Sequence, residues 1–585
     1  MEFFYKKNKN RDLFSELEKD INGTFKCIQN YIPLYSRYFS LNETNWNTIN
    51  LNNSKSIRQI ERKYNDNHFS VILNNGKTAD SFFKLAPLLD PVRYMVGKYK
   101  DISINDTPIH EQLPRHDIKG YSKLDDPNNM AYTDGFFTYL SSKLKTTYYN
   151  PHCLEFYGSY LSIKHNYKIN VFDDIEYLYE SEYFLENLDK DFTINGDVDN
   201  ELINFNTRKN KERIQLNKTI DAISISSLDE NEFNTVFNKS DTDTTIIHLS
   251  DIKSIDDLVL HSSSKISTCS NKSESTCSSR TSCTSNTSNQ NEDSENSDDE
   301  NSQTGETNNS EKEINNSLHD EDSGCDTSSE TSEYLEAEFK QFPVQIIAME
   351  KLHMTLDKYM EDYMIPKDEW LSIFMQIFMI LLTYKKAFEF THNDLHTNNI
   401  MFNETDDEYL YYKFNNIYYK VPTYGKIYKI IDFGRSIYKF RGKLICSDSY
   451  HHDGDAATQF NFGPYYNKDK PEIKPNYSFD LCRLACSLYD NFVDDDDEKT
   501  EDELDDIRDL VIEWCQDDAN RNILYKKNGK DRYPGFKLYK MITRTVHNHT
   551  PERQLNKNLF RQFSTKLRNV NRQKLINIDV IKSEC

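Results

Sequence analysis

The sequence has few apolar residues for its length. Hydrophobic residues make up 37% of 585, so part of the chain should form no core. Residues 1–7 contain no apolar run of signal-peptide length. The most apolar stretch, 371–382, is too short to span a bilayer and includes Ser372 and Gln376. We therefore expect a soluble, intracellular protein that makes no membrane contact, with 371–382 in a buried helix.

The sequence also lacks any cysteine pattern typical of disulfides or metal sites. Its 11 cysteines form no C-x-x-C pair and show no metal-ligand spacing with histidine, which favours a reduced protein. Positive charge is scarce as well, because 71 basic residues face 95 acidic ones, a net charge of −24. This balance argues against general binding to nucleic acid or anionic membranes.

Aliphatic residues are almost absent from residues 261–333, which consist mainly of Ser, Thr, Asn, Asp, Glu and Lys. Such a segment cannot bury enough surface to offset the entropy of ordering it. The composition predicts a disordered acidic insert. The preceding residues 191–260 are polar and carry no clear pattern. A second acidic run, 494–506, is typical of a solvated loop.

Two short motifs indicate a chemistry. The run His392–Asn399 has the pattern H-x-D-L-x-x-x-N, and Asp432 begins the tripeptide Asp-Phe-Gly further on. Apolar, strand-like residues follow the first motif and precede the second. Phosphoryl transfer from ATP needs one carboxylate to orient the acceptor hydroxyl, and an amide and a second carboxylate to hold Mg²⁺. Asp394, Asn399 and Asp432 are the residues that these motifs supply.

Both motifs resemble those of the protein kinase superfamily. The composition and the segment 83–91 are similar to serine/threonine-protein kinases of giant DNA viruses. The resemblance implies an α+β, bilobal protein-kinase-like fold, with a small β-rich N-lobe carrying the insert and a mainly helical C-lobe. It also implies ATP and Mg²⁺ as cofactors and protein substrates as partners. His396 stands where such kinases have a lysine that supports the γ-phosphate, so we assign it a catalytic role beside Asp394.

The N-lobe assignment starts from a hairpin. Strand-like residues 69–73 and 81–85 flank Asn-Asn-Gly at 74–76. Kinases carry their phosphate-binding lysine on the strand after such a turn, which points to Lys84. Helix 130–148 should then carry its acidic partner, and Asp134 is the acid in that helix. Two departures stand out, because no glutamate occurs in this helix and no glycine-rich loop precedes Lys84.

The resemblance also places the hinge and the C-lobe. A strand at 344–348 leads to Met349, Glu350 and Leu352, where backbone amides would bind adenine. Two helices, 355–363 and 368–390, should follow and deliver the chain to His392.

Three further residues complete this assignment. Asp480 corresponds to the buried aspartate that anchors the catalytic-loop backbone. Glu472 and Arg553 are candidates for an ion pair in the C-lobe.

The expected organisation is the following: N-terminal extension 1–59, first part of the N-lobe 60–190, uncertain polar segment 191–260, disordered insert 261–333, last N-lobe strand and hinge 334–350, C-lobe 351–570 and tail 571–585. Two alternatives to a serine/threonine-protein kinase remain open. The pattern His-x-Asp-Leu-His also resembles small-molecule kinases of the aminoglycoside and choline type. The missing glycine loop and helix glutamate favour a catalytically weak pseudokinase scaffold.

Overall fold

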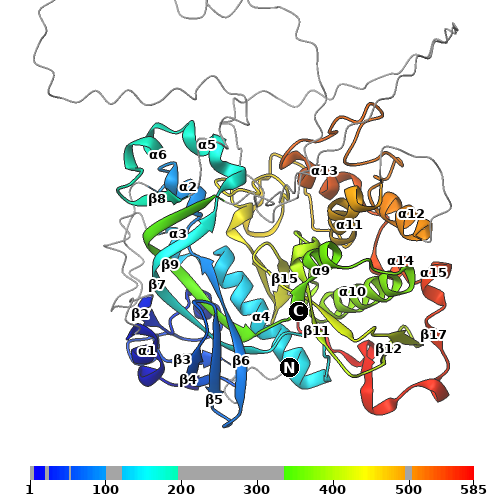
Figure 1. Cartoon of the computed structure of the whole chain (residues 1–585), viewed down its shortest axis with the longest axis horizontal. Coiled ribbons are helices and arrows are strands. Elements are labelled where there is room, and N and C mark those ends of the chain that lie inside the picture. Colours follow the sequence, from blue (N-terminus) through cyan, green and yellow to red (C-terminus); the bar gives the residue numbers. More distant parts are fainter. Residues whose placement is uncertain (1–4, 20–24, 52–54, 100–121, 196–334, 494–503) are drawn as a thin grey trace, which may run out of the picture. The chain divides into compact units, whose positions relative to one another are not determined.

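The computed structural model describes residues 5–19, 25–51, 55–99, 122–195, 335–493 and 504–585, all within one compact unit. The fold is mixed α+β: strands dominate the N-terminal region and helices the C-terminal part (Figure 1). The expected insert 261–333, the polar segment from residue 196 to 260 and most of the acidic run 494–506 lie outside the described residues.

A seven-stranded antiparallel sheet forms the N-terminal region. Its strands follow the order β2-β7-β9-β6-β5-β4, and β8 pairs with β9 beside this path. Aromatic and β-branched residues fill the strands, as in the run His-Phe-Ser-Val-Ile-Leu of β5. The strands are β2 (Phe25–Gln29), β4 (Ile57–Lys63), β5 (His68–Leu73), β6 (Thr78–Pro87), β7 (Phe156–Asn170), β8 (Phe192–Asn195) and β9 (Glu336–Glu350).

The hairpin expected around residues 74–76 is confirmed. β5 and β6 are antiparallel, and Gly76 has a φ of 80°, which the turn needs and which glycine adopts without strain. β2 lies within residues 1–59, expected to be an N-terminal extension, yet it pairs with β7 and belongs to the sheet. Its buried Phe25 shows why, because this side chain needs the apolar face of the sheet.

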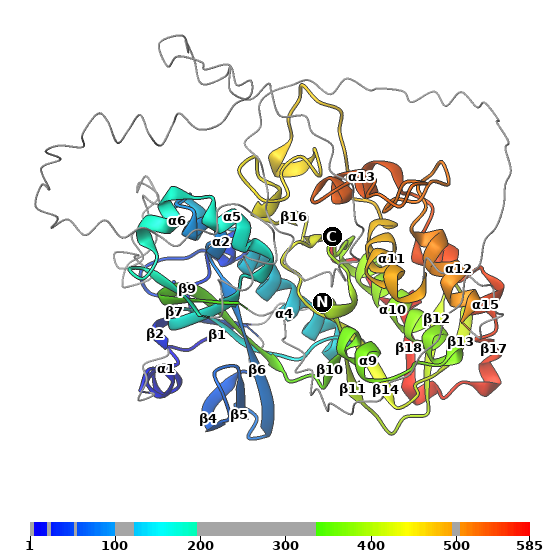
Figure 2. The same cartoon turned by 45° about the horizontal axis from the view of Figure 1, so that its top comes forward.

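One long helix, α4 (Met130–Tyr148), packs against β7 and β9, as Figure 2 shows. It occupies the residues expected for it. Gly135 allows a close approach, because a Cβ atom there would lie 2.3 Å from the side-chain nitrogen of Gln345 on β9. The other helices of this region are α1 (Arg11–Glu18), α2 (Pro91–Met95), α3 (Ser122–Asp125), α5 (Ile175–Tyr179) and α6 (Glu182–Asn187).

Helix α10 (Lys367–Phe388) is the centre of the C-terminal part. Among the described residues it alone is long and apolar enough to cross a membrane, but 89% of its apolar window is buried inside the protein. Phe374 and Phe378 pack edge-on against Trp514, which is the contact of a core helix. The other helices are α9 (Leu356–Asp362), α11 (Phe479–Phe492), α12 (Asp505–Trp514), α13 (Lys537–Thr545), α14 (Pro551–Gln554) and α15 (Asn558–Arg561).

Four small sheets complete the described fold. Two of them contain strands that lie between the two motifs in sequence. In the sheet β10-β11-β14, β11 leads into the segment 405–425 and β14 follows it. The strands β12 and β13 of the sheet β17-β13-β12-β18 come from that segment. The strands are β1 (Tyr5–Lys7), β3 (Ile49–Leu51), β10 (Met354–Thr355), β11 (Ile400–Glu404), β12 (Tyr409–Phe414), β13 (Ile417–Pro422), β14 (Lys426–Ile430), β15 (Ile437–Phe440), β16 (Lys443–Cys446), β17 (Ser564–Thr565) and β18 (Leu575–Asn577).

Part of residues 571–585, expected to be a tail, belongs to the sheet β17-β13-β12-β18. β18 pairs in parallel with β12, and Ile576, Ile578 and Ile581 are buried. Apolar side chains at these positions leave water on packing, which holds the segment on the fold.

Candidate active site

The loop that carries Asp394 is fixed by Asp480 on α11. The two carboxylate oxygens of Asp480 accept the backbone amides of His392 and Asn393, at 2.9 and 2.8 Å. This confirms the anchoring role expected of Asp480. Asn393 adopts a left-handed φ of 63°, a conformation that asparagine tolerates better than most residues. Asp480 therefore fixes the backbone of this loop, so that the side chains after Asn393 take one defined orientation.

Asp394 is buried, and three side chains contact its carboxylate. Tyr539 donates a hydrogen bond to Oδ1 at 2.7 Å, and the Nε atoms of Arg435 and Arg483 lie 3.7 and 3.8 Å from Oδ2 and Oδ1. Burial works against ionisation, but Arg435, His396 and Arg483 together hold the pKa of Asp394 below its usual value. Asp394 is thus a carboxylate at neutral pH.

His396 and Asn399 contact each other within the same loop. Nδ2 of Asn399 lies 3.0 Å from Nε2 of His396 and donates to the backbone oxygen of Asp394 at 2.9 Å. Burial lowers the pKa of His396 to about 4, so the ring is neutral at pH 7. If Nε2 accepts from Asn399, the proton lies on Nδ1, which is buried without a partner.

Lys84 joins two acidic residues from different parts of the chain. Its Nζ lies 2.6 Å from Oδ2 of Asp134 on α4 and 2.8 Å from Oδ1 of Asp432. Desolvation opposes the charges, but Lys84 holds the pKa of Asp432 at about 2, and the two carboxylates raise the pKa of Lys84. Asp134 also accepts the amide of Phe433 at 3.0 Å, which links α4 to the Asp-Phe-Gly turn.

The three residues expected to form a hinge, Met349, Glu350 and Leu352, are engaged to different degrees. The amide of Glu350 donates to the oxygen of Glu155 at 3.0 Å, and its carboxylate pairs with Lys429 at 2.5 Å and Lys145 at 3.2 Å. Burial lowers the pKa of Lys429 to about 8 despite this pair. Glu350 is therefore committed to the fold, whereas the Leu352 amide makes no hydrogen bond within the described residues.

Met349 lies at the end of β9 opposite Phe82 and is almost fully buried. Its backbone oxygen accepts the hydroxyl of Ser81 at 3.1 Å. Met349 therefore belongs to the buried contact between β6 and β9.

A four-residue turn, Tyr64–Asn67, joins β4 and β5 and contains no glycine. The side-chain oxygen of Asn65 accepts the amides of Asn67 and His68 at 2.9 and 2.8 Å. Both backbone amides therefore already have a hydrogen-bond acceptor within the turn. An open cleft of about 740 Å³ adjoins the turn and is lined by Asn65, Asp66, Asn67, His68, Phe82 and Lys351.

The expected pairing of Glu472 with Arg553 is wrong. Glu472 lies 3.2 Å from Lys474, and Arg553 donates to the side chain of Asn548. Both side chains reach neighbours close in sequence, since exposed charges gain little from a distant partner.

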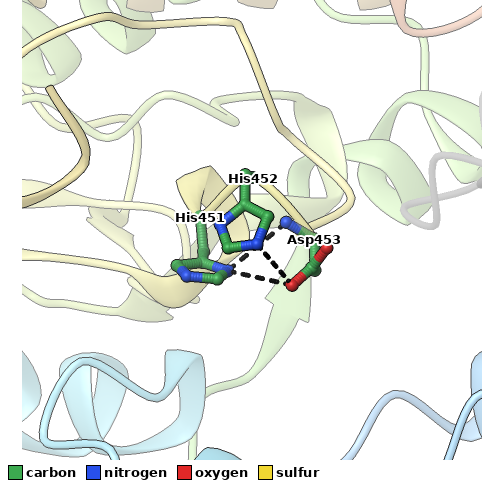
Figure 3. Close-up of side chains that lie close together, drawn as sticks. All are labelled: His451, His452 and Asp453. Atoms are coloured by element: carbon green, nitrogen blue, oxygen red, sulfur yellow. Dashed lines mark hydrogen bonds and ion pairs between the residues drawn. The ribbon is translucent and has the colours of Figure 1, made fainter. Parts of the chain in front are cut away.

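Histidine and acidic side chains also gather away from the loop. Within the described residues, His451, His452 and Asp453 form the one group with the spacing of metal ligands (Figure 3). Nε2 of His452 lies 2.8 Å from Oδ2 of Asp453, but both side chains are more than three-quarters exposed. We assign no function to this group.

Sequence reasoning missed Arg435, Arg483 and Tyr539. Arg435 directly follows Asp-Phe-Gly, so its position gave a usable signal. Arg483 lies three residues after Asp480 on α11, nearly one helical turn, and Tyr539 has no motif at all. No protein-family model matches this sequence, and no curated protein matches it.

Proposed function

We propose that this chain is an ATP- and Mg²⁺-dependent phosphotransferase, a serine/threonine-protein kinase with a two-lobed, kinase-like fold. The contact of Lys84 with Asp134 and Asp432 carries the proposal. These residues come from β6, α4 and the turn after β14, and each was expected on separate grounds to serve one site. In protein kinases a lysine on a strand pairs with an acid on a helix, and the Asp-Phe-Gly aspartate must be in place beside them.

The order of elements supports the same proposal. Lys84 lies on the third strand of the meander β4-β5-β6, the place of the phosphate-binding lysine in kinases. Then follow α4, the strands β7 and β9, the helices α9 and α10, and the loop with Asp394. The burial of α10 is in keeping with a soluble, intracellular enzyme.

The open cleft gives ATP a place beside these residues. Phe82 and Lys84 are two positions apart on β6, so their side chains leave the same face of the strand. Phe82 and Lys351 line the cleft. We place the adenine base there, near Leu352 and Met349, and the phosphates towards Lys84.

Two oxygen atoms fit a magnesium ion. Oδ2 of Asp432 and Oδ1 of Asn399 make no hydrogen bond or ion pair within the described residues, and the Asp432 side chain is 47% exposed. Carboxylate and amide oxygens are ligands that Mg²⁺ accepts. When bound, the ion neutralises charge on the phosphates.

Asp394 orients the acceptor in this proposal. Its carboxylate accepts the proton of the substrate hydroxyl as that oxygen bonds to the γ-phosphorus and the bond to the departing ADP breaks. Neutral His396 donates a hydrogen bond through Nδ1 and supplies no positive charge. The nearby guanidinium of Arg435, whose Nη1 is buried without a partner, is a second donor for the transferred group.

One observation favours a catalytically weak scaffold as the second candidate. The amides of Asn67 and His68 are already bonded to Asn65, so the turn over the cleft has fewer donors for phosphate than a glycine-rich loop. A scaffold would bind ATP without transferring phosphate. A small-molecule kinase would instead phosphorylate alcohols and leave proteins unmodified.

The test uses full-length protein with labelled ATP, Mg²⁺, and panels of proteins and small alcohols. Asp394→Asn and Asp432→Asn should each lower turnover by about 100- to 10,000-fold. Asp432→Asn should also weaken Mg²⁺-dependent ATP binding, which Asp394→Asn should leave nearly intact.

Asp469→Asn changes an exposed side chain and is the matched control. It should change neither turnover nor Mg²⁺-dependent ATP binding. Full activity in either site variant would contradict the assignment.

A further inference from the structure

Tyr539 links two side chains at the candidate active site. It lies on α13, and its hydroxyl donates to Oδ1 of Asp394 at 2.7 Å while accepting from Nε of Arg483 at 2.8 Å. Both bonds lie within the normal range for strong hydrogen bonds. The chain Arg483–Tyr539–Asp394 therefore fixes the hydroxyl proton towards Asp394.

The Tyr539 ring is held as firmly as its hydroxyl. It is 4% exposed and stacks on Phe536, with ring centroids 5.2 Å apart and planes 15° from parallel. The guanidinium groups of Arg483 and Arg435 lie 5.3 and 5.8 Å from its centroid. A residue that must leave the site for each substrate would be held less tightly.

The hydrogen bond from Tyr539 gives the two carboxylate oxygens of Asp394 different roles. Tyr539 occupies Oδ1. The nearest cation to Oδ2 is Nε of Arg435 at 3.7 Å, beyond hydrogen-bond range. Oδ2 is therefore the oxygen that remains for an incoming hydroxyl.

We propose that Tyr539 is a positioning residue of this site: it binds Oδ1 and so turns Oδ2 towards the substrate hydroxyl. The inference rests on the proposed function, because it assumes that Asp394 accepts the substrate proton. Tyr539 acts through Asp394 and does not touch the substrate. A hydrogen-bonded neighbour that holds a reacting group in the productive orientation raises the reaction rate, because a misoriented group reacts more slowly.

The experiment compares Tyr539→Phe with wild type and with Tyr525→Phe. Tyr525 is a matched control, because its hydroxyl donates to the Asp490 carboxylate at 3.0 Å at an exposed site. We expect Tyr539→Phe to lower kcat about tenfold and to leave the KM for ATP unchanged. Tyr525→Phe should match wild type, and melting curves should show all three proteins folded.

Other outcomes overturn the inference. A faster Tyr539→Phe enzyme would mean that the hydroxyl blocks the acceptor, and an unchanged kcat would mean that Tyr539 only packs. In both cases an inactive Asp394→Asn variant leaves the proposed function standing. If Asp394→Asn is fully active, or wild type transfers no phosphate, the proposed function and this inference fall together.

Discussion

Lys84 is the single positive charge between two carboxylates. Replacing it with methionine removes the charge that we propose to bind the ATP phosphates, and leaves Asp134, whose side chain is 4% exposed, without its ion partner. We expect Lys84→Met to abolish most ATP binding and transfer. Stability should fall by about 3 kcal/mol, since breaking a buried pair leaves an uncompensated charge. ATP titration and thermal melting measure both effects.

Lys77→Met and Lys98→Met are the controls for this change, because both lysines are exposed. Neither should alter ATP binding or the melting temperature. A Lys84→Met protein with wild-type activity would show that another residue binds the phosphates, while leaving the role of Asp394 open.

The sequence predicted some residues of the site and not others, for a physical reason. Asp394, Asn399 and Asp432 lie in short motifs whose spacing is set by local backbone geometry. Lys84 and Asp134 followed from a turn and a helix, and the structure brings them together. Tyr539 lies 145 residues from Asp394. Only tertiary packing of α13 joins the two, and no local pattern encodes it.

At the scale of elements, Gly135 explains how the short side chain of Asp134 can reach Lys84, where a longer glutamate was expected. The glycine lets α4 lie close to β9, and Asp134 next to it then reaches Lys84 at 2.6 Å. Gly135→Ala should force α4 away from Gln345, cost about 1–3 kcal/mol of stability and lengthen the Lys84–Asp134 contact. Melting temperature and ATP affinity should therefore both fall.

Thr147→Ala, at an exposed position of α4, is the control and should leave both quantities unchanged or slightly raised. Comparing the two alanine variants separates the effect of helix propensity from the effect of the distance between α4 and β9. An unaltered Gly135→Ala protein would mean that the side chain of Gln345 yields without moving the helix.

The hairpin and the long helices that position the site could be predicted from the sequence, but many shorter strands and their partners could not. The pattern around residues 74–76 specified a hairpin, and the apolar run of α10 specified a buried helix. The strands β17 and β18 are two and three residues long. Such short strands carry no periodicity and form because β12 and β13 offer them open edges.

For the molecule as a whole, the residues on either side of the segment 196–335 already pair with each other. Asn195 at the end of β8 pairs with Glu336 at the start of β9. Replacing residues 197–334 with a four-residue turn should keep the fold and the ATP affinity. Closing this hairpin over a short turn, where roughly 140 residues now intervene, should add at most about 3 kcal/mol to the free energy of unfolding.

Thermal melting and ATP titration of the shortened protein test this expectation. A large loss of stability would show that residues 197–334 pack against the rest of the chain. Unchanged stability with lost activity would instead give those residues a part in the reaction.

The pairing of β12 with β18 also sets an order of events during synthesis. The segment between Asn399 and Asp432 leaves the ribosome well before its partners, Ser564–Thr565 and Leu575–Asn577. At common elongation rates the delay is roughly 8 to 30 s. Throughout that time the hairpin has two bare strand edges, which invite pairing with other chains. The nascent chain thus exposes pairing edges between Asn399 and Asp432, the two proposed magnesium ligands, until its last-made strands cover those edges.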